Sequence, residues 1–149
     1  MRRIAMLSLG VAALAALWPA APATARNTEH FYNIQDAVTS GDGHENLLDE
    51  VAFYFEGQPH DTPRTVLGTF TARRSSRGAF RSDLASCQVA FLSALIRLQQ
   101  VAVREGGDAI IDIQSITGGQ TTSSSTDFRC VAGSVVVQVA LKGTVVKLK

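Results

Sequence analysis

The clearest hydrophobic pattern in the chain lies between Ser82 and Glu105. Apolar residues recur there at intervals of three and four, which places them on one face of an α-helix. They are Leu84, Cys87, Phe91, Leu95, Leu98 and Ala102, and the opposite side carries Ser93, Arg97, Gln100 and Arg104. Ser82 or Asp83 can cap the first turn by accepting a backbone N–H bond. Gly106-Gly107 supplies the left-handed residue that ends a helix, so the pattern predicts one long helix.

Short runs of β-branched, aromatic and aliphatic residues predict strands on both sides of this helix. The runs are Val51 to Phe55, Val66 to Thr71, Ala109 to Ile116, Ser134 to Leu141 and Thr144 to Leu148. Lys142-Gly143 joins the last two, either as a tight turn or as a bulge within one long strand. We therefore expect a sheet of four or five strands.

Two remaining segments complete the expected organisation. Residues 31–48 predict two short helical turns or an irregular lead-in, and the polar run Thr117 to Thr126 predicts an exposed, mobile loop. A doubly wound sheet needs helices between most strands, and only one long helix is present. The expected fold is a single small α+β domain over residues 26–149, with an antiparallel or mixed sheet and the long helix packed on one face.

The first 25 residues have the pattern of a secretory signal peptide. A basic start, Met1-Arg2-Arg3, precedes an apolar run of 14 residues from Ile4 to Leu17 and the small-residue site Ala23-Thr24-Ala25. A membrane span needs roughly 20 apolar residues, so cleavage is expected in preference to an uncleaved anchor. The mature protein is then periplasmic or secreted.

Charge is balanced overall but segregated along the mature chain. Loss of Arg2 and Arg3 leaves 12 basic against 13 acidic side chains, a net −1, which gives no general case for nucleic acid as a partner. Residues 27–61 carry eight acids and no Lys or Arg, whereas residues 62–81 carry arginines and no acid. Arg73, Arg74, Arg77 and Arg81 are candidate anion-binding residues in an exposed loop, since the guanidinium matches phosphate geometry. The alternatives are neutralisation by the acidic segment or simple solvation.

The two cysteines, Cys87 and Cys130, both lie in the mature part. An even count in an exported protein favours a disulfide, and the spacing is not the Cys-x-x-Cys of a redox motif. Because Cys87 belongs to the apolar helix face, the bond is expected to fasten the start of the helix to a strand of the C-terminal hairpin.

Motifs for other chemistry are weak. No phosphate-binding loop or Gly-x-Ser-x-Gly elbow occurs. Serines can be paired with His60 on paper, but a hydrolase would also need a positioned base and oxyanion donors. A metal site could combine His44, Glu45, His60 and Asp61, although nothing in their spacing brings them together. We expect no cofactor and no catalytic residues.

Several segments together resemble a family of small exported bacterial proteins of unknown function, whose members often carry an "excinuclease ABC" or "excinuclease ATPase subunit" label. The segments are Phe53 to Gln58, Cys87 to Ile96, Gly107 to Ile113, Phe128 to Gly133 and Ala140 to Gly143. The chain lacks the phosphate loop and the cysteine pairs that such a DNA-repair ATPase needs. More distantly, residues 87–133 are similar to the sensor lipoprotein of the Rcs envelope-stress pathway and to the YbjQ-type family, described as heavy-metal binders.

These observations predict a non-enzymatic envelope protein that acts as a binding, sensing or interaction module. The expected partner is an envelope protein or an anionic ligand, with no nucleic acid and no stable membrane insertion after cleavage. The alternative is a periplasmic metal-binding protein, and an exported hydrolase has the least support.

We expect cleavage after Ala25, because the Ala-x-Ala site directly follows the apolar run. Mass spectrometry of the periplasmic fraction should give a mature protein whose first residue is Arg26. A protein that starts elsewhere, or that is recovered intact from the inner membrane, contradicts this expectation.

Overall fold

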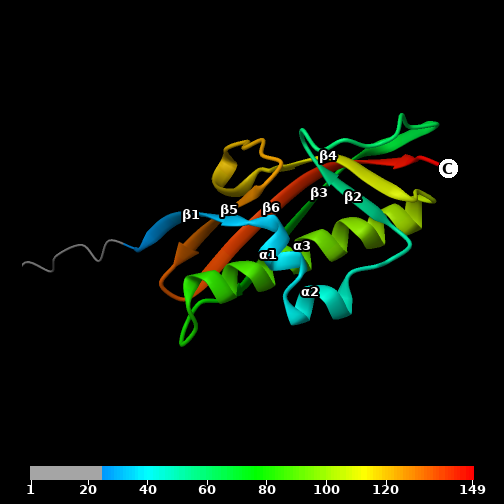
Figure 1. Cartoon of the computed structure of the whole chain (residues 1–149). Coiled ribbons are helices and arrows are strands. Elements are labelled where there is room, and N and C mark those ends of the chain that lie inside the picture. The colour runs from blue at the N-terminus through cyan, green and yellow to red at the C-terminus, as the bar shows by residue number, and fades with distance from the viewer. Residues whose placement is uncertain (1–24) are drawn as a thin grey trace, which may run out of the picture.

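The computed structural model describes residues 25–149, without the side chains of residues 42–44. The expected leader therefore lies outside the described residues, apart from Ala25. The described part is a small α+β domain with one long helix, as predicted (Figure 1). Its elements are β1 Asn27–Asn33, α1 Ile34–Val38, α2 Gly41–Asn46, β2 Ala52–Phe55, β3 Thr65–Arg77, α3 Asp83–Glu105, β4 Ala109–Ser115, the 3-10 turn η1 Thr117–Gly119, β5 Asp127–Gly133 and β6 Val136–Lys147.

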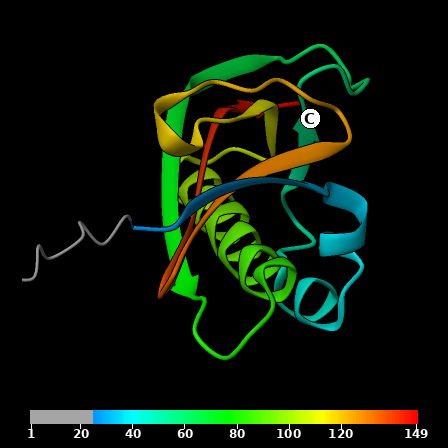
Figure 2. The ribbon, with the colours of Figure 1, turned by 90° about the vertical axis from the view of Figure 1, so that its left-hand side faces the viewer.

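The six strands form one mixed sheet that forks at β6. Strand β3 pairs with β6 over its whole length, from Thr65 opposite Lys147 to Arg77 opposite Val136. The other edge of β6 pairs first with β5 and then with β4. Strand β1 extends the β5 branch and β2 extends the β4 branch, the latter in parallel. The sheet curls around α3, which lies along its concave face (Figure 2).

Helix α3 begins and ends as its sequence predicts. The Ser82 hydroxyl accepts a bond from the Ala85 N–H at 3.2 Å, and Gly106 ends the helix at φ 77°. The apolar face is buried from Ser86 onward, but Leu84 is 45% exposed, contrary to expectation, because it lies in the first turn before contact with the sheet begins. Phe91 stacks on Phe128 of β5 with ring centroids 4.1 Å apart, so the helix and sheet share an aromatic core.

A buried amide holds the irregular segment before β2 against the helix. Gln99 is fully buried, and its Nε2 donates to the carbonyls of Leu48 (3.0 Å) and Val51 (2.8 Å). Its Oε1 accepts the Leu48 N–H at 2.9 Å. Every polar atom of the amide is therefore paired. Gln99 supplies hydrogen-bond partners to backbone groups of Leu48 and Val51, which lie outside any helix or strand.

The C-terminal run is one long strand, which decides between the two alternatives for Lys142-Gly143. Gly143 lies in the middle of β6, and a side chain there would come within 2.6 Å of the Ile110 methyl Cγ2. The bulge lies in β4 instead, where the pairing register with β6 shifts between Ile111 and Gln114 and Asp112 has φ 52°.

The remaining differences concern where strands begin and end. Strand β1 occupies the start of the expected lead-in, and two short helices follow it. Strand β5 takes up Asp127–Gly133, so the C-terminal hairpin is β5–β6. Strand β3 continues past the expected end at Thr71 as far as Arg77, because its partner β6 offers pairing as far as Val136.

Helix α3 also has the length and composition of a membrane span. Most of its apolar window, 61%, is buried inside the domain. Core helices of globular domains meet the same criterion, so burial against the sheet accounts for the hydropathy of α3.

Cys87 and Cys130 form a disulfide, with their Cα atoms 5.9 Å apart. The bond joins the start of α3 to β5, so the predicted pairing of Cys87 with Cys130 is confirmed. The expected hairpin of Ser134 to Leu141 with Thr144 to Leu148 is wrong, because that run is the single strand β6 and Cys130 lies on the strand before it. Both cysteines are fully buried in the aromatic core.

Reduction of this disulfide should lower the melting temperature clearly. The bond closes a loop of 43 residues, for which chain entropy gives at most about 4 kcal/mol. That is a large share of a typical domain stability of roughly 5–15 kcal/mol. Thermal unfolding with and without reductant measures the effect, and thiol titration of the unfolded, unreduced protein should find no free thiol. Two titratable thiols, or an unchanged melting temperature, contradict the expectation.

Candidate functional site in a groove on the outer face of the sheet

The last residue of β4 and the turn that follows it fill the point at which β5 and β4 separate along β6. The Ser115 hydroxyl accepts the Arg129 N–H at 3.1 Å. The Thr117 hydroxyl accepts the Ala140 N–H at 2.9 Å and donates to the Arg129 carbonyl at 3.0 Å. All of these groups are buried, and buried backbone groups need such partners. Two hydroxyls therefore replace the missing ladder bonds at the fork.

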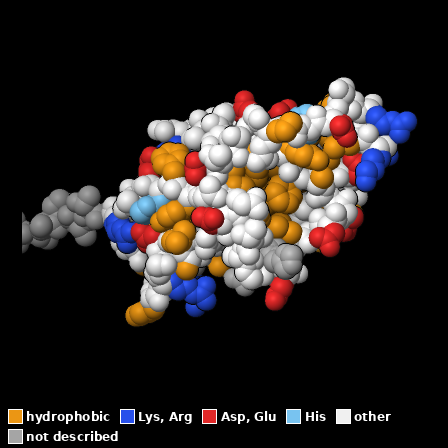
Figure 3. Space-filling model, in the orientation of Figure 1, with side chains coloured by type: hydrophobic (Ala, Val, Ile, Leu, Met, Phe, Trp, Pro, Cys, Tyr) orange, Lys and Arg blue, Asp and Glu red, His pale blue; other side chains and the backbone are white. Residues whose placement is uncertain are grey.

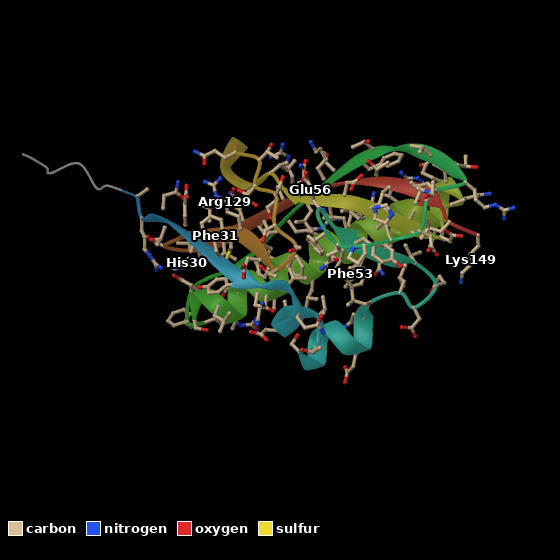
Figure 4. All side chains as sticks on the ribbon, turned by 45° about the horizontal axis from the view of Figure 1, so that its top comes forward. His30, Phe31, Phe53, Glu56, Arg129 and Lys149 are labelled. Carbon is tan, nitrogen blue, oxygen red and sulfur yellow. A yellow bond between two sulfur atoms is a disulfide. The ribbon has the colours of Figure 1, made fainter. Side chains whose placement is uncertain are left out.

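Arg129 lies next to this fork and points away from the helix. Its neighbours on β5, Phe128 and Cys130, face the core, so strand alternation directs Arg129 to the outer face. The side chain is only 2% exposed. One terminal nitrogen donates to Gln120 Oε1 at 3.0 Å and the other pairs with Glu29 of β1. Figure 4 shows Arg129 between β1 and the turn that follows β4.

The Nε of Arg129 is the buried side-chain atom that lacks a partner in the described part of the chain. An unpaired buried N–H costs about 1–3 kcal/mol, and such groups are rare in folded proteins. Because this N–H is buried, a ligand on the outer face would contact the other groups of the hollow that Arg129 lines.

Two adjoining hollows form a groove over this face. The first, about 360 Å³, is lined by Asn27, Glu29, Gly118, Gln120, Arg129, Val131, Gly133, Val136 and Gln138. The second, about 260 Å³, is lined by Arg73, Arg74, Ser75, Thr117, Gly118, Gln138, Val139 and Ala140. Gly118 and Gln138 belong to both, so the groove runs from β1 across β5 and β6 to β3. We call it the outer groove.

The four predicted arginines are exposed, but they do not form a loop. Arg73, Arg74 and Arg77 lie on β3 and only Arg81 lies in the connection to α3. The loop prediction is wrong because β6 offers partners as far as Val136. Arg73 and Arg74 line the outer groove, whereas Arg77 and Arg81 do not.

The acidic segment does not neutralise these arginines. Among the described side chains, the ion pairs of acids in residues 27–61 join Glu29 to Arg129 and no acid to Arg73, Arg74, Arg77 or Arg81. The basic edge of β3 therefore carries charge without a counter-ion from the acidic segment.

The serine-rich run beside the groove is anchored. Ser115 and Thr122 exchange backbone hydrogen bonds of 3.0 and 2.7 Å, and Gln114 Nε2 donates to the Ser123 hydroxyl at 2.9 Å. Hydrogen bonds from Ser123 and Gln114 also lower the pKa of Glu56. The expected exposure is wrong for Thr117, which is buried because its hydroxyl fills the fork.

His30 and His60 do not line the outer groove. His30 Nε2 is 3.0 Å from Asp83, and His60 Nδ1 is 2.9 Å from the Asp61 carbonyl. No cluster of three potential metal ligands occurs within the described residues. His44, part of the hypothetical metal site, has its side chain outside them.

Sequence reasoning missed Arg129, the most buried charge among the described residues. The signal is present, since a lone basic residue stands between the apolar Phe128 and Cys130, which is strand alternation. The alternation is easily overlooked, because the same residues can also be interpreted as an irregular segment that leads into the strand beginning at Ser134.

Comparison of the chain with protein-family models, curated proteins and solved structures finds no match. The resemblance to exported bacterial families stays a prediction from the quoted segments. The outer groove is therefore the basis on which a function can be proposed.

Replacing Thr117 with Val should destabilise the domain by about 2 kcal/mol, because a buried N–H and a buried carbonyl lose their partner while the side-chain shape is kept. Chemical denaturation measures the change. Thr117→Ser, which keeps the hydroxyl, is the matched control and should retain most of the stability. If both variants behave alike, the hydroxyl does not hold the fork.

Proposed function

We propose that the protein is a non-enzymatic binding module of the cell envelope that holds an anionic group of its ligand in the outer groove. The observation that carries this proposal is the wall of the outer groove, in which Arg73 and Arg74 have no ion pair with a described residue. The guanidinium is the side-chain group best suited to carboxylate or phosphate groups.

The charge around the groove supports an anion in preference to a cation. Glu29 offsets Arg129, which leaves Arg73 and Arg74 as the charges without an ion pair in the groove wall. Gln120 and Gln138 add neutral amides, which can bond either lone pairs or N–H groups of a ligand. The groove is open to solvent and wide enough for a small anion or an acidic side chain.

Support for a binding role over catalysis comes from what lines the groove. The lining contains no histidine and no cysteine, so the residues most often used as general base or thiolate nucleophile are not at hand. Within the described part, neither His30 nor His60 bonds a serine hydroxyl.

Titration with inorganic phosphate and, separately, with a short glutamate peptide tests the proposal. Amide NMR shifts should occur at Gly118, Gln138 and Arg73, with a dissociation constant on the order of 1 mM, about 4 kcal/mol. Added salt should weaken binding, because the exposed arginines are screened beyond about 8 Å at physiological ionic strength. The response to the two probes distinguishes a free phosphate from a carboxylate carried by a peptide.

Arg73→Ser should weaken binding without loss of melting temperature, since Arg73 forms no ion pair with a described residue. Arg64→Ser is the matched control, because Arg64 is exposed beside the opposite end of β3 and does not line the groove. Binding that is equal in both variants, or shifts that lie outside the groove, would refute the outer groove as the site.

A further inference from the structure

A fully exposed aromatic ring projects from the end of the domain where β3 turns into α3. Phe80 is 108% exposed and has φ 65°, a left-handed conformation uncommon for a residue other than glycine. A large apolar side chain held in a strained conformation towards water points to a function at that place.

The base of this projection is firmly held. The Ser76 hydroxyl donates to the Ser86 carbonyl and the Ser86 hydroxyl donates to the Arg77 carbonyl, each at 3.0 Å. The Gly78 N–H donates to the Val135 carbonyl of the β5–β6 turn at 2.8 Å. Strand β3, helix α3 and the β5–β6 turn are therefore tied together beneath Phe80.

Further exposed apolar side chains lie on the elements joined at this end. Val135 is 63% exposed, Val136 is 41% exposed, and Leu84 is the exposed residue of the first turn of α3. We call Phe80, Leu84 and Val135 the apolar tip, since Val136 lines the outer groove. Figure 3 shows an apolar side chain at the protruding end of the β3–α3 connection, with basic side chains beside it.

The surroundings of the apolar tip are positively charged. Arg77 and Arg81 flank Phe80, are exposed and have no ion pair with a described residue. The nearest acid along the chain, Asp83, is already paired with Arg26 and lies 3.0 Å from His30. The tip thus combines exposed apolar groups with two cations that no described acid pairs.

We propose that the apolar tip docks the protein on the surface of an anionic lipid bilayer. An exposed aromatic and aliphatic group enters the boundary between headgroups and acyl chains, while arginines remain among the anionic headgroups. Such contact is peripheral and reversible, and involves no spanning segment. It places β3 and the adjoining outer groove close to the membrane.

The shape of the tip favours a bilayer over a protein partner. Protein interfaces bury about 800 Å² on each side and seat their anchors in pockets, whereas here one ring projects from a convex end. A fluid headgroup layer accommodates a convex projection without a complementary pocket.

The proposal is tested with a tryptophan reporter in the processed, exported protein. Trp18 is the only tryptophan of the chain and belongs to the expected leader, so Phe80→Trp introduces a single probe at the tip. Vesicles of mixed phosphatidylglycerol and phosphatidylcholine should shift its emission to the blue and brominated lipid should quench it, whereas phosphatidylcholine alone should have little effect. Val66→Trp is the matched control, because Val66 is 64% exposed at the far end of β3.

Affinity for the mixed vesicles measured by co-sedimentation should fall about fivefold for each of Arg77→Ser and Arg81→Ser, as expected for about 1 kcal/mol per basic residue at a charged surface. Phe80→Ser should reduce it by about tenfold or more, and Arg64→Ser should leave it unchanged. Phosphate binding in the outer groove is an independent readout that Phe80→Ser should not alter.

Three outcomes would overturn the proposal. The first is an unshifted emission of Phe80→Trp on anionic vesicles, and the second is an equal shift of Val66→Trp. The third is a photo-crosslinker at position 80 that captures a protein in intact cells and no lipid, which would assign the tip to a protein partner.

Discussion

The fork in the sheet depends on side chains that pair with backbone groups for which no neighbouring strand is in reach. Where β5 and β4 diverge from β6, the N–H and carbonyl of Arg129 and the N–H of Ala140 are buried, and the hydroxyls of Ser115 and Thr117 satisfy them. Without these bonds, either β4 and β5 would have to stay side by side along β6, or the buried backbone groups would be unpaired, which is costly away from water. The opening on which the outer groove is built is therefore a consequence of two short side chains.

Strand β5 divides its side chains between the core and the outer groove. Phe128 and Cys130 face α3, where they stack on Phe91 and bond Cys87, while Arg129 faces away. The crosslink and the aromatic stack thus hold the backbone that positions the guanidinium. A change in the core at β5 is expected to move the groove, whereas the exposed arginines of β3 can vary with little effect on the fold.

Much of this arrangement could be predicted from local pattern. The long helix and its caps followed from periodicity. The crosslink followed from the position of Cys87 on the apolar stripe and from the expectation of export. Strand β1 could not be recognised, since five of its seven residues are Asn, Thr, Glu or His and it pairs along an exposed edge. Local alternation around Arg129 could place it on one face of a strand. The roles of Arg129 and Thr117 could not be predicted, because they are set by a fork between strands far apart in the sequence.

The pairing of β1 imposes an order on folding. It is the first strand of the domain, yet its sheet partner is β5, with Asn27 opposite Gly133. In a chain that emerges from its N-terminus, β1 cannot pair until most of the sequence has followed, whereas the backbone hydrogen bonds of α3 join residues close in the sequence. Pairings of such long range are slow to form, and an unpaired strand is a template for wrong partners. The polar side chains of β1 make it a poorer template for wrong pairing during this delay than an apolar strand would be.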